Sequence, residues 1–254
     1  MHYTLKKSLG QHFLHDENIC KKIVSQVSLK PNLSLLEIGP GGGALTKYLL
    51  DFSNTHYKAI EVDKEKVDFL KKTFPQINDL IFQQDILKSE MPFDGQFSVI
   101  GNFPYNISSP ILFKILDWEA RVDEVIGMFQ KEVALRIAEK EGSKQYGILS
   151  VLMQAFFRVE YLFDVHENCF TPPPKVKSGV VRFSNTQNPF GIADKKKFIA
   201  IVKAAFNQRR KTLRNALKGT LSPEALTDPI MQKRAEQLSV ADFVELYKKY
   251  MVHE

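Results

Sequence analysis

The first 180 residues of the 254-residue chain alternate between short apolar runs and amphipathic stretches, and this alternation limits the fold more than any other feature. Apolar runs between turn residues predict buried strands, and apolar residues at helical spacing predict helices. Such an order is typical of βα units around a largely parallel sheet. The predicted strands are residues 33–38, 57–62, 80–84, 97–101, 124–129, 156–163 and 176–183, and between them lie amphipathic, helix-like stretches such as 44–51, 64–73 and 110–118.

The last two predicted strands flank a turn-rich segment, 170–174, and we expect them to form an antiparallel pair that makes the seven-stranded sheet mixed. The polar, turn-prone stretch 184–189 is a reasonable linker. Beyond it only helical patterns follow, at 195–206, 208–218 and 240–251. We therefore predict two domains: residues 1–185, which are α/β, and residues 186–254, a small all-helical C-terminal domain.

A glycine-rich turn follows the first of these strands, in the segment Glu-Ile-Gly-Pro-Gly-Gly-Gly-Ala at 37–44. Glycines such as Gly39 and Gly41 let the backbone approach a ligand closely, and the helix that follows offers unpaired N–H groups. An ordinary tight turn would have the same composition. The turn alone therefore leaves a structural role and a cofactor role equally open.

Acidic residues at the next strand ends favour the cofactor role. Glu61 ends the strand after the turn, 22 residues beyond Gly39, where a carboxylate can accept both hydroxyls of a ribose. Asp85 follows the third strand, where it can accept a hydrogen bond from an adenine amino group. The Gly-x-Gly-x-x-Gly pattern of nicotinamide enzymes is met only in relaxed form, with Ala44 in the last place. An acid at the end of three successive strands suits S-adenosylmethionine better, because that ligand has no phosphate.

The fourth strand is followed by the loop Asn102-Phe103-Pro104-Tyr105. This loop resembles the Asn/Asp-Pro-Pro-Tyr loops of amino methyltransferases. An adenine amino nitrogen is a poor nucleophile because its lone pair is delocalised into the ring. The Asn102 side-chain oxygen and the Phe103 carbonyl can accept its two N–H groups, Pro104 stiffens the turn, and Tyr105 can stack on the base. The alternative is an ordinary Asn-x-Pro turn at a strand end.

Two further features bear on a nucleic-acid substrate. Phe170 precedes three prolines and is a candidate for the other side of an adenine sandwich, although a rigid turn with Phe170 in the core gives the same pattern. Nine basic and no acidic residues lie between 195 and 218, in a chain of net charge +6. A stretch of one sign favours phosphate binding over a solvated helix face. The candidate RNA-binding residues are Arg209, Arg210, Lys211 and Arg214.

Other classes of protein are disfavoured. The two cysteines, Cys20 and Cys169, are far apart and outside any metal-ligand spacing, so we expect neither a metal nor a disulfide. The sequence contains no run of eighteen apolar residues and no secretory signal at its start, so we expect a cytoplasmic location and no membrane partner.

Taken together, these motifs resemble the ribosomal RNA adenine dimethylases, in the branch that acts on the small subunit. The resemblance covers nearly the whole chain and includes 8–14 (Ser-Leu-Gly-Gln-His-Phe-Leu), 37–46, 101–108 with Pro110, 128–134, 170–178 and 207–215. It implies a Rossmann-like class I methyltransferase fold with S-adenosylmethionine as methyl donor. By the same resemblance, His12 and Leu14 fold over the methionyl part of the cofactor, and Gly39, Glu61, Asp85 and Asn102 complete the site.

The family methylates N6 of two adjacent adenosines in the 3′-terminal hairpin loop of 16S rRNA, which makes the assembling small subunit the implied partner of what we expect to be a monomer. Two positions depart from the family pattern: Phe103 stands where leucine is usual, and His12 where asparagine is also common. Two alternatives remain open, namely a large-subunit adenine methyltransferase of the macrolide-resistance type and a non-catalytic RNA-binding assembly factor. The intact loop at 102–105 argues against the second alternative.

Overall fold

The computed structural model describes residues 12–251, and the chain divides into two compact units. The first unit comprises residues 1–134 and 160–185, and the second comprises residues 135–159 and 186–254. The junction at 185/186 coincides with the predicted domain boundary, but the second unit also takes in 135–159. The functional division into two domains stays a prediction.

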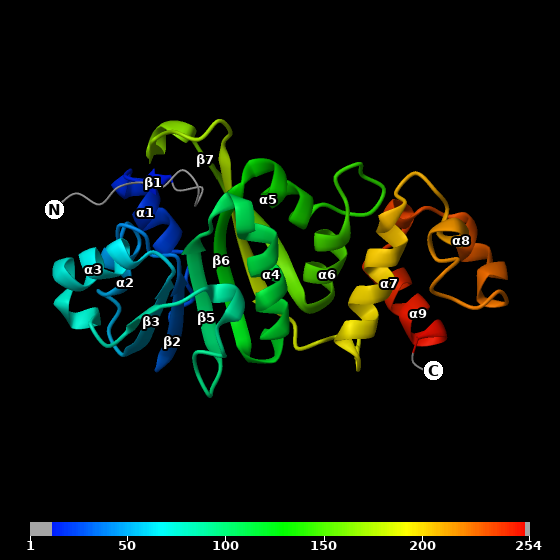
Figure 1. The fold of residues 1–254 in the computed structure, drawn as a ribbon, viewed down its shortest axis with the longest axis horizontal. Coiled ribbons are helices and arrows are strands. Elements are labelled where there is room, and N and C mark those ends of the chain that lie inside the picture. The colour runs from blue at the N-terminus through cyan, green and yellow to red at the C-terminus, as the bar shows by residue number, and fades with distance from the viewer. Residues whose placement is uncertain (1–11, 252–254) are drawn as a thin grey trace. The chain divides into compact units, whose positions relative to one another are not determined.

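A seven-stranded mixed sheet forms the frame of the first unit, in the order β4-β3-β2-β5-β6-β9-β7 (Figure 1). The strands from β4 to β6 run parallel to their neighbours, and β9 runs antiparallel to β6. The predicted mixed α/β sheet is therefore confirmed. The strands are β2 Leu33–Ile38, β3 Thr55–Glu61, β4 Ile81–Gln83, β5 Phe97–Asn102, β6 Val122–Gln130, β7 Phe157–Val165 and β9 Ser178–Asn185.

A separate two-stranded sheet joins β1 (Phe13–Leu14) to β8 (Phe170–Thr171), with Leu14 opposite Phe170. Neither strand was predicted, since two residues are too few for a periodic pattern. This pairing holds the beginning of the described chain beside the segment that precedes β9.

The helices of the first unit begin at recognisable capping residues. Asp16 caps α1 and Asp63 caps α3, in each case through a side-chain oxygen that accepts a backbone N–H of the first turn. Lysines in the last turn of both helices complement the helix dipole. The bounds are α1 Glu17–Val24, α2 Thr46–Leu49, α3 Lys64–Thr73, α4 Ser108–Asp117 and α5 Lys131–Ala138, which continues into the second unit.

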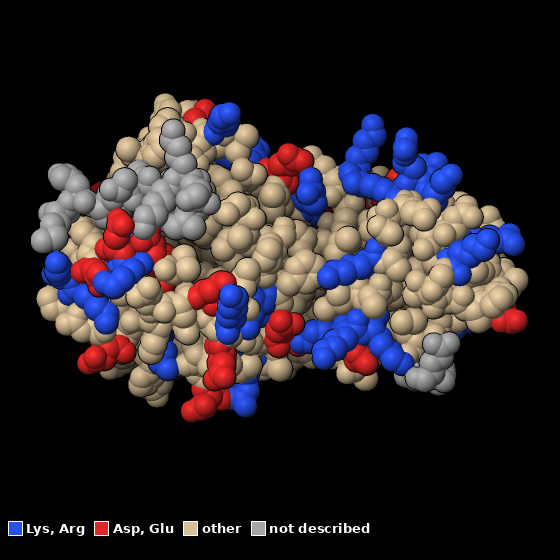
Figure 2. Space-filling model, in the orientation of Figure 1, with Lys and Arg blue, Asp and Glu red and all other residues tan. Residues whose placement is uncertain are grey.

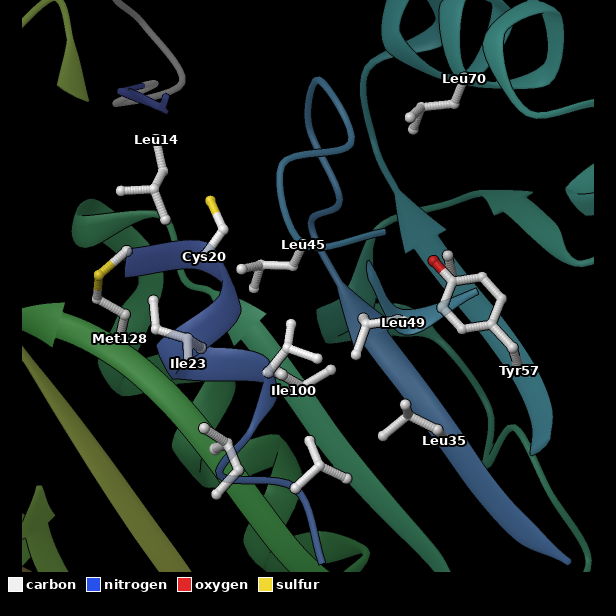
Figure 3. Packing of buried hydrophobic residues seen from close by; sticks show 14 of the residues in the cluster. Leu14, Cys20, Ile23, Leu35, Leu45, Leu49, Tyr57, Leu70, Ile100 and Met128 are labelled. Carbon is white, nitrogen blue, oxygen red and sulfur yellow. The ribbon is translucent and has the colours of Figure 1, made fainter. Parts of the chain in front are cut away.

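One hydrophobic cluster joins α1, α2 and α3 to a single face of the sheet (Figure 3). Cys20 and Ile23 of α1 are buried with Leu35 of β2 and Ile100 of β5. Four apolar residues of α4, namely Ile111, Leu112, Ile115 and Leu116, are fully buried outside this cluster, and Figure 1 shows α4 across the other face, in front of β5 and β6. With both faces covered, the parallel strands expose their functional side chains only at their ends.

The second unit is helical, with α6 (Ile148–Phe156), α7 (Lys195–Asn207), α8 (Leu213–Ala216) and α9 (Val240–Tyr250). Its core contains aromatic pairs: Phe198 lies edge-on to Phe156 and Tyr247, at centroid distances of 6.3 and 5.7 Å, and Phe206 stacks on Phe243 at 5.7 Å. These contacts draw α6 together with α7 and α9.

One helix prediction needs correction. The stretch 208–218 was predicted as one helix, but 208–212 form a turn and α8 begins only after Thr212, whose backbone is extended. The amide of Leu213 instead donates to the carbonyl of Lys233, at 2.8 Å. Helices α1, α5 and α6 were not predicted. Within residues 12–251, no helix combines the length and apolar character needed to cross a membrane.

Candidate active site

A cavity of about 270 Å³ opens at the carboxyl ends of β2, β3, β4 and β5. Parallel strands place these ends at one edge of the sheet, which is where ligands bind in folds of this kind. All seven predicted cofactor residues line it, namely His12, Leu14, Gly39, Gly41, Glu61, Asp85 and Asn102.

The glycine-rich turn lies between β2 and α2 and forms part of the cavity wall. Gly39 and Gly41 have φ values of 68° and 59°, a region that residues with a Cβ rarely adopt. The amide of Gly39 donates to the carbonyl of Ile60, at 2.9 Å, which anchors the turn to β3. These glycines are therefore required by the backbone conformation, and the same conformation gives the turn its place on the cavity wall.

Two carboxylates stand at neighbouring strand ends. Glu61 is only 5% exposed, and its two oxygens accept the amides of Gly41 (3.1 Å) and Asp63 (2.9 Å). Asp85 accepts the amide of Leu87 at 2.9 Å and caps the short turn after β4. Backbone donors thus fix both side chains at the edge of the cavity.

A third carboxylate, Glu37, lies deeper in the same wall and is 1% exposed. The hydroxyls of Thr46 and Tyr57 both donate to its Oε2, at 2.8 and 2.5 Å. Burial raises the pKa of Glu37 to about 7, against the opposing effect of these two hydrogen bonds. Sequence analysis did not name Glu37 among the cofactor residues, although it lies near the end of the first of the three strands, just before the glycine turn.

The loop from Asn102 to Tyr105 lines the opposite side of the cavity. The Asn102 side-chain nitrogen donates to the backbone carbonyl of His12 at 3.4 Å, which directs its oxygen elsewhere. Among residues 12–251, neither that oxygen nor the Phe103 carbonyl accepts a described hydrogen bond. Of the two acceptors that the sequence predicted for an adenine amino group, Asn102 is partly exposed on the cavity wall, whereas Phe103 is completely buried in this structure.

The first described residue, His12, joins three parts of the site. Its ring stacks on Tyr105, with centroids 5.7 Å apart and planes at 28°. Its Nδ1 lies 2.8 Å from the carbonyl oxygen of Pro172, to which a protonated nitrogen donates. His12 therefore links the loop at 102–105 to the proline-rich loop after Phe170.

Phe103, the departure from the family pattern, is completely buried, so its side chain is not a surface of the site. Its ring lies edge-on to Phe129 at 5.2 Å and fills the space left by two glycines. A Cβ at Gly101 would lie 2.5 Å from this ring, and one at Gly127 would lie 2.8 Å from it. Phe103 thereby fixes the loop through packing.

Phe170 does not line the described wall of the cavity. It is 2% exposed and belongs to the hydrophobic cluster around α1. Its pairing with Leu14 across β1 and β8 accounts for this burial. A stacking role for Phe170 stays a prediction, and this arrangement does not support it.

The predicted RNA-binding residues lie in the second unit, on the turn between α7 and α8 and at the start of α8. All four are exposed, but Arg209 also pairs with Glu236 and donates to the carbonyls of Lys144 and Tyr146. Figure 2 shows Lys and Arg side chains gathered on this unit with few acidic ones. Arg209 therefore has an intramolecular role that the sequence pattern did not reveal.

The residues present fit S-adenosylmethionine. Carboxylates at two adjacent strand ends supply acceptors for a ribose diol and an amino group, and the side chains of Val62 and Ile86 supply apolar surface beside them. Among the described residues of the cavity wall, Lys66 is the only Lys or Arg. Such a wall suits a nucleoside without phosphates. No group of three or more His, Cys, Asp or Glu side chains that could hold a metal occurs within 12–251.

Comparison with known proteins identifies the chain's relatives. Residues 2–251 match the family described as ribosomal RNA adenine dimethylase. "Ribosomal RNA small subunit methyltransferase A" from Cytophaga hutchinsonii is 52% identical over 245 residues, which cover 95% of both chains. The protein of that name from Flavobacterium johnsoniae is 52% identical over 248 residues, covering 96% of this chain and 95% of the other.

Solved structures agree with this assignment. A dimethyladenosine transferase from Plasmodium falciparum superposes with a TM-score of 0.80 at 25% identity, over 94% of this chain and 97% of that one. The 23S rRNA methyltransferase ErmE gives a TM-score of 0.66 at 23% identity, over 93% of this chain and 99% of that one. At that identity the second match indicates a shared fold only.

Proposed function

Because the chain belongs to the ribosomal RNA adenine dimethylase family, we propose that the loop at 102–105 is where an adenine of small-subunit ribosomal RNA receives its methyl groups. The chain is an S-adenosylmethionine-dependent adenine dimethyltransferase of ribosomal RNA. One observation carries the assignment of the site: Asn102 and Tyr105 line the same cavity as Glu61 and Asp85.

The cofactor half of the site is formed by the three strand ends before β5. Glu61 holds the ribose hydroxyls and Asp85 accepts the adenine amino group, while Gly39 and Gly41 let the backbone approach. His12 and Leu14 cover the methionyl part. When bound, S-adenosylmethionine supplies an electrophilic methyl group on sulfur. The order of these residues around one cavity supports this assignment.

The acceptor half acts on the adenine amino group. The oxygens of Asn102 and Phe103 accept its two N–H groups, which localises the nitrogen lone pair toward the methyl donor. Pro104 restricts the loop, and the ring of Tyr105 stacks on the base, a contact worth about 1–3 kcal/mol. Holding both reactants in line supplies much of the acceleration, and the proton of the methylated nitrogen passes to solvent.

The target adenine must leave its stack to reach this loop, which is easier from a hairpin loop than from a duplex. This supports the proposal that the substrate is the pair of adjacent adenosines in the 3′-terminal hairpin loop of 16S rRNA. The exposed residues Arg210, Lys211 and Arg214 contact the RNA backbone, with Arg209 beside them. Action as a monomer and a cytoplasmic location stay predictions.

Methyl transfer to purified ribosomal particles tests the proposal. Under-methylated small subunits, large subunits and free 16S rRNA are each incubated with the protein and labelled S-adenosylmethionine, and the labelled nucleotides are mapped. We expect dimethyladenosine at two adjacent positions of the small-subunit hairpin and no label on large subunits. Label on large subunits alone, or on no particle, would contradict it.

A further inference from the structure

The hydroxyl of Tyr105 lies 2.6 Å from the hydroxyl of Ser178, a residue that sequence analysis left without a role. Ser178 is completely buried, and within the described part of the chain its hydroxyl has no other recorded partner. Tyr105 is half-buried, and burial raises its pKa, so the phenol stays neutral and can donate or accept this bond. A buried serine is thus aimed at the residue proposed to stack on the adenine.

The sheet topology explains how a residue 73 positions away reaches the catalytic loop. Asn102, at the end of β5, pairs with Met128 of β6, so both strands end at the cavity edge. Strand β9 is antiparallel to β6 and therefore begins at that same edge, with Ser178 opposite Gln130. An antiparallel return strand places its first residue where the parallel strands place their last.

Ser178 is also held rigidly. The amide of Lys131 donates to the carbonyl of Lys177 at 2.9 Å, which closes the ladder immediately before Ser178. Immediately after it, a Cβ on Gly179 would come within 2.8 Å of Ala134 and 2.7 Å of the Tyr161 hydroxyl. The serine hydroxyl therefore sits on a backbone that has little room to move.

We propose that Ser178 is a positioning residue that fixes the position of the Tyr105 ring for the target adenine. The hydrogen bond holds the ring at its hydroxyl end, whereas His12 contacts only one face of it. Without this anchor the ring can swing about the Cα–Cβ bond of Tyr105, and the stacked base loses its alignment with Asn102. The inference rests on the proposed stacking role of Tyr105.

The test removes the hydrogen bond from either side. Ser178→Ala and Tyr105→Phe should each lower single-turnover methyl transfer about fivefold at saturating RNA and cofactor, as expected for one neutral hydrogen bond. RNA affinity should be unchanged, since most of the RNA contacts lie elsewhere. The double variant should be no slower than either single variant, because both changes delete the same interaction. Ser178→Thr, which keeps the hydroxyl, should recover the rate.

A buried serine outside the site provides the control. Ser150 is completely buried and its hydroxyl donates to the carbonyl of Arg136, so Ser150→Ala matches the loss of a buried hydroxyl but should leave the rate unchanged. A wild-type rate in folded Ser178→Ala, or effects that multiply to about 25-fold in the double variant, would overturn the positioning role. If Ser178→Ala does not fold, a wild-type rate in Tyr105→Phe would likewise overturn the positioning role.

Tyr105→Ala separates this inference from the proposed function. A strong loss of rate in Tyr105→Ala together with a normal rate in Ser178→Ala would overturn only the positioning role. A normal rate in Tyr105→Ala would overturn the stacking role, and the positioning role with it.

Discussion

The amide of Gly41 donates a 3.1 Å hydrogen bond to Oε2 of Glu61, which joins the glycine-rich turn directly to the end of β3. The carboxylate proposed to hold the ribose therefore also holds the turn on which the cofactor lies. Its second oxygen is fixed by the amide of Asp63. Any change at Glu61 consequently acts on two walls of the cavity at once.

Glu61→Ala should weaken S-adenosylmethionine binding, because lost hydrogen bonds to a charged group cost about 1.5–3 kcal/mol each. Titration calorimetry on the folded variant gives the affinity directly. Glu65→Ala, which removes an exposed carboxylate four residues away, is the matched control and should bind normally. Unchanged affinity in Glu61→Ala would exclude the ribose role.

Asn102→Ala should lower the single-turnover rate by roughly 100-fold or more, because the lost oxygen acts on the reacting nitrogen. RNA affinity should stay within about twofold, since one contact among many is removed. Rapid-quench assays on pre-bound substrate measure the rate, with Asn168→Ala on an exposed turn as the control. A near-normal rate would mean that the loop is only structural.

The stability of the protein should depend on pH through Glu37. Its pKa is about 7 in the folded state against an ordinary 4.5, so the folded state binds this proton more tightly than the unfolded state. Its contribution therefore favours folding below pH 4.5 and is lost as the pH rises through about 7, a loss on the order of 3 kcal/mol.

Urea unfolding at pH 5 and pH 8 isolates this contribution when the wild type is compared with Glu37→Gln. The free energy of unfolding should fall more for the wild type between these two values, because the glutamine has no proton to lose. All other titrating groups are common to both proteins. Equal pH dependence in the two proteins would show that Glu37 does not titrate in this range.

Replacing Arg210, Lys211 and Arg214 with glutamine should reduce the log–log salt slope of RNA binding by about two to three units if each contacts a phosphate. Cofactor affinity should not change. Replacing Lys64, Lys71 and Lys72 of α3 removes the same charge elsewhere and controls for net charge. A salt slope unchanged from the wild type would show that these three residues do not contact RNA phosphates.

Arg209 should behave differently from its neighbour. Arg209→Gln removes the contacts with Glu236 and with the carbonyls of Lys144 and Tyr146, so its melting temperature should fall. Arg210→Gln, an exposed change next to it, should melt like the wild type. Equal melting temperatures for the two variants would show that the contacts of Arg209 contribute little to the stability of the folded protein.

The cofactor half of the site could be predicted from the sequence because it depends on local order. Glu61 and Asp85 follow successive apolar runs, and parallel strands bring such ends to one edge whatever the details of packing. The same reasoning located Asn102. Burial of Glu37 could not be predicted, because it depends on how Thr46 and Tyr57 turn toward it from other elements.

The parts that sequence reasoning missed depend on long-range pairing. Phe170 was considered for the adenine sandwich, but its burial follows from pairing with Leu14, which no local pattern indicates. Ser178 likewise reaches Tyr105 only because β9 returns beside β6. Helix α6 escaped prediction because its sequence is almost entirely apolar, and a short apolar run cannot be told from a buried strand by its pattern alone.

The alternation of the chain between its two units has a consequence for synthesis. Residues 135–159 belong to the second unit, yet their partners α7 and α9 follow residue 186. On the ribosome, α6 therefore emerges with its apolar surface uncovered and stays so while β7 and β9 are made. For the same reason, a protein that ends at residue 185 still contains α6 but lacks α7 and α9. The apolar surface of α6 then stays exposed and favours aggregation.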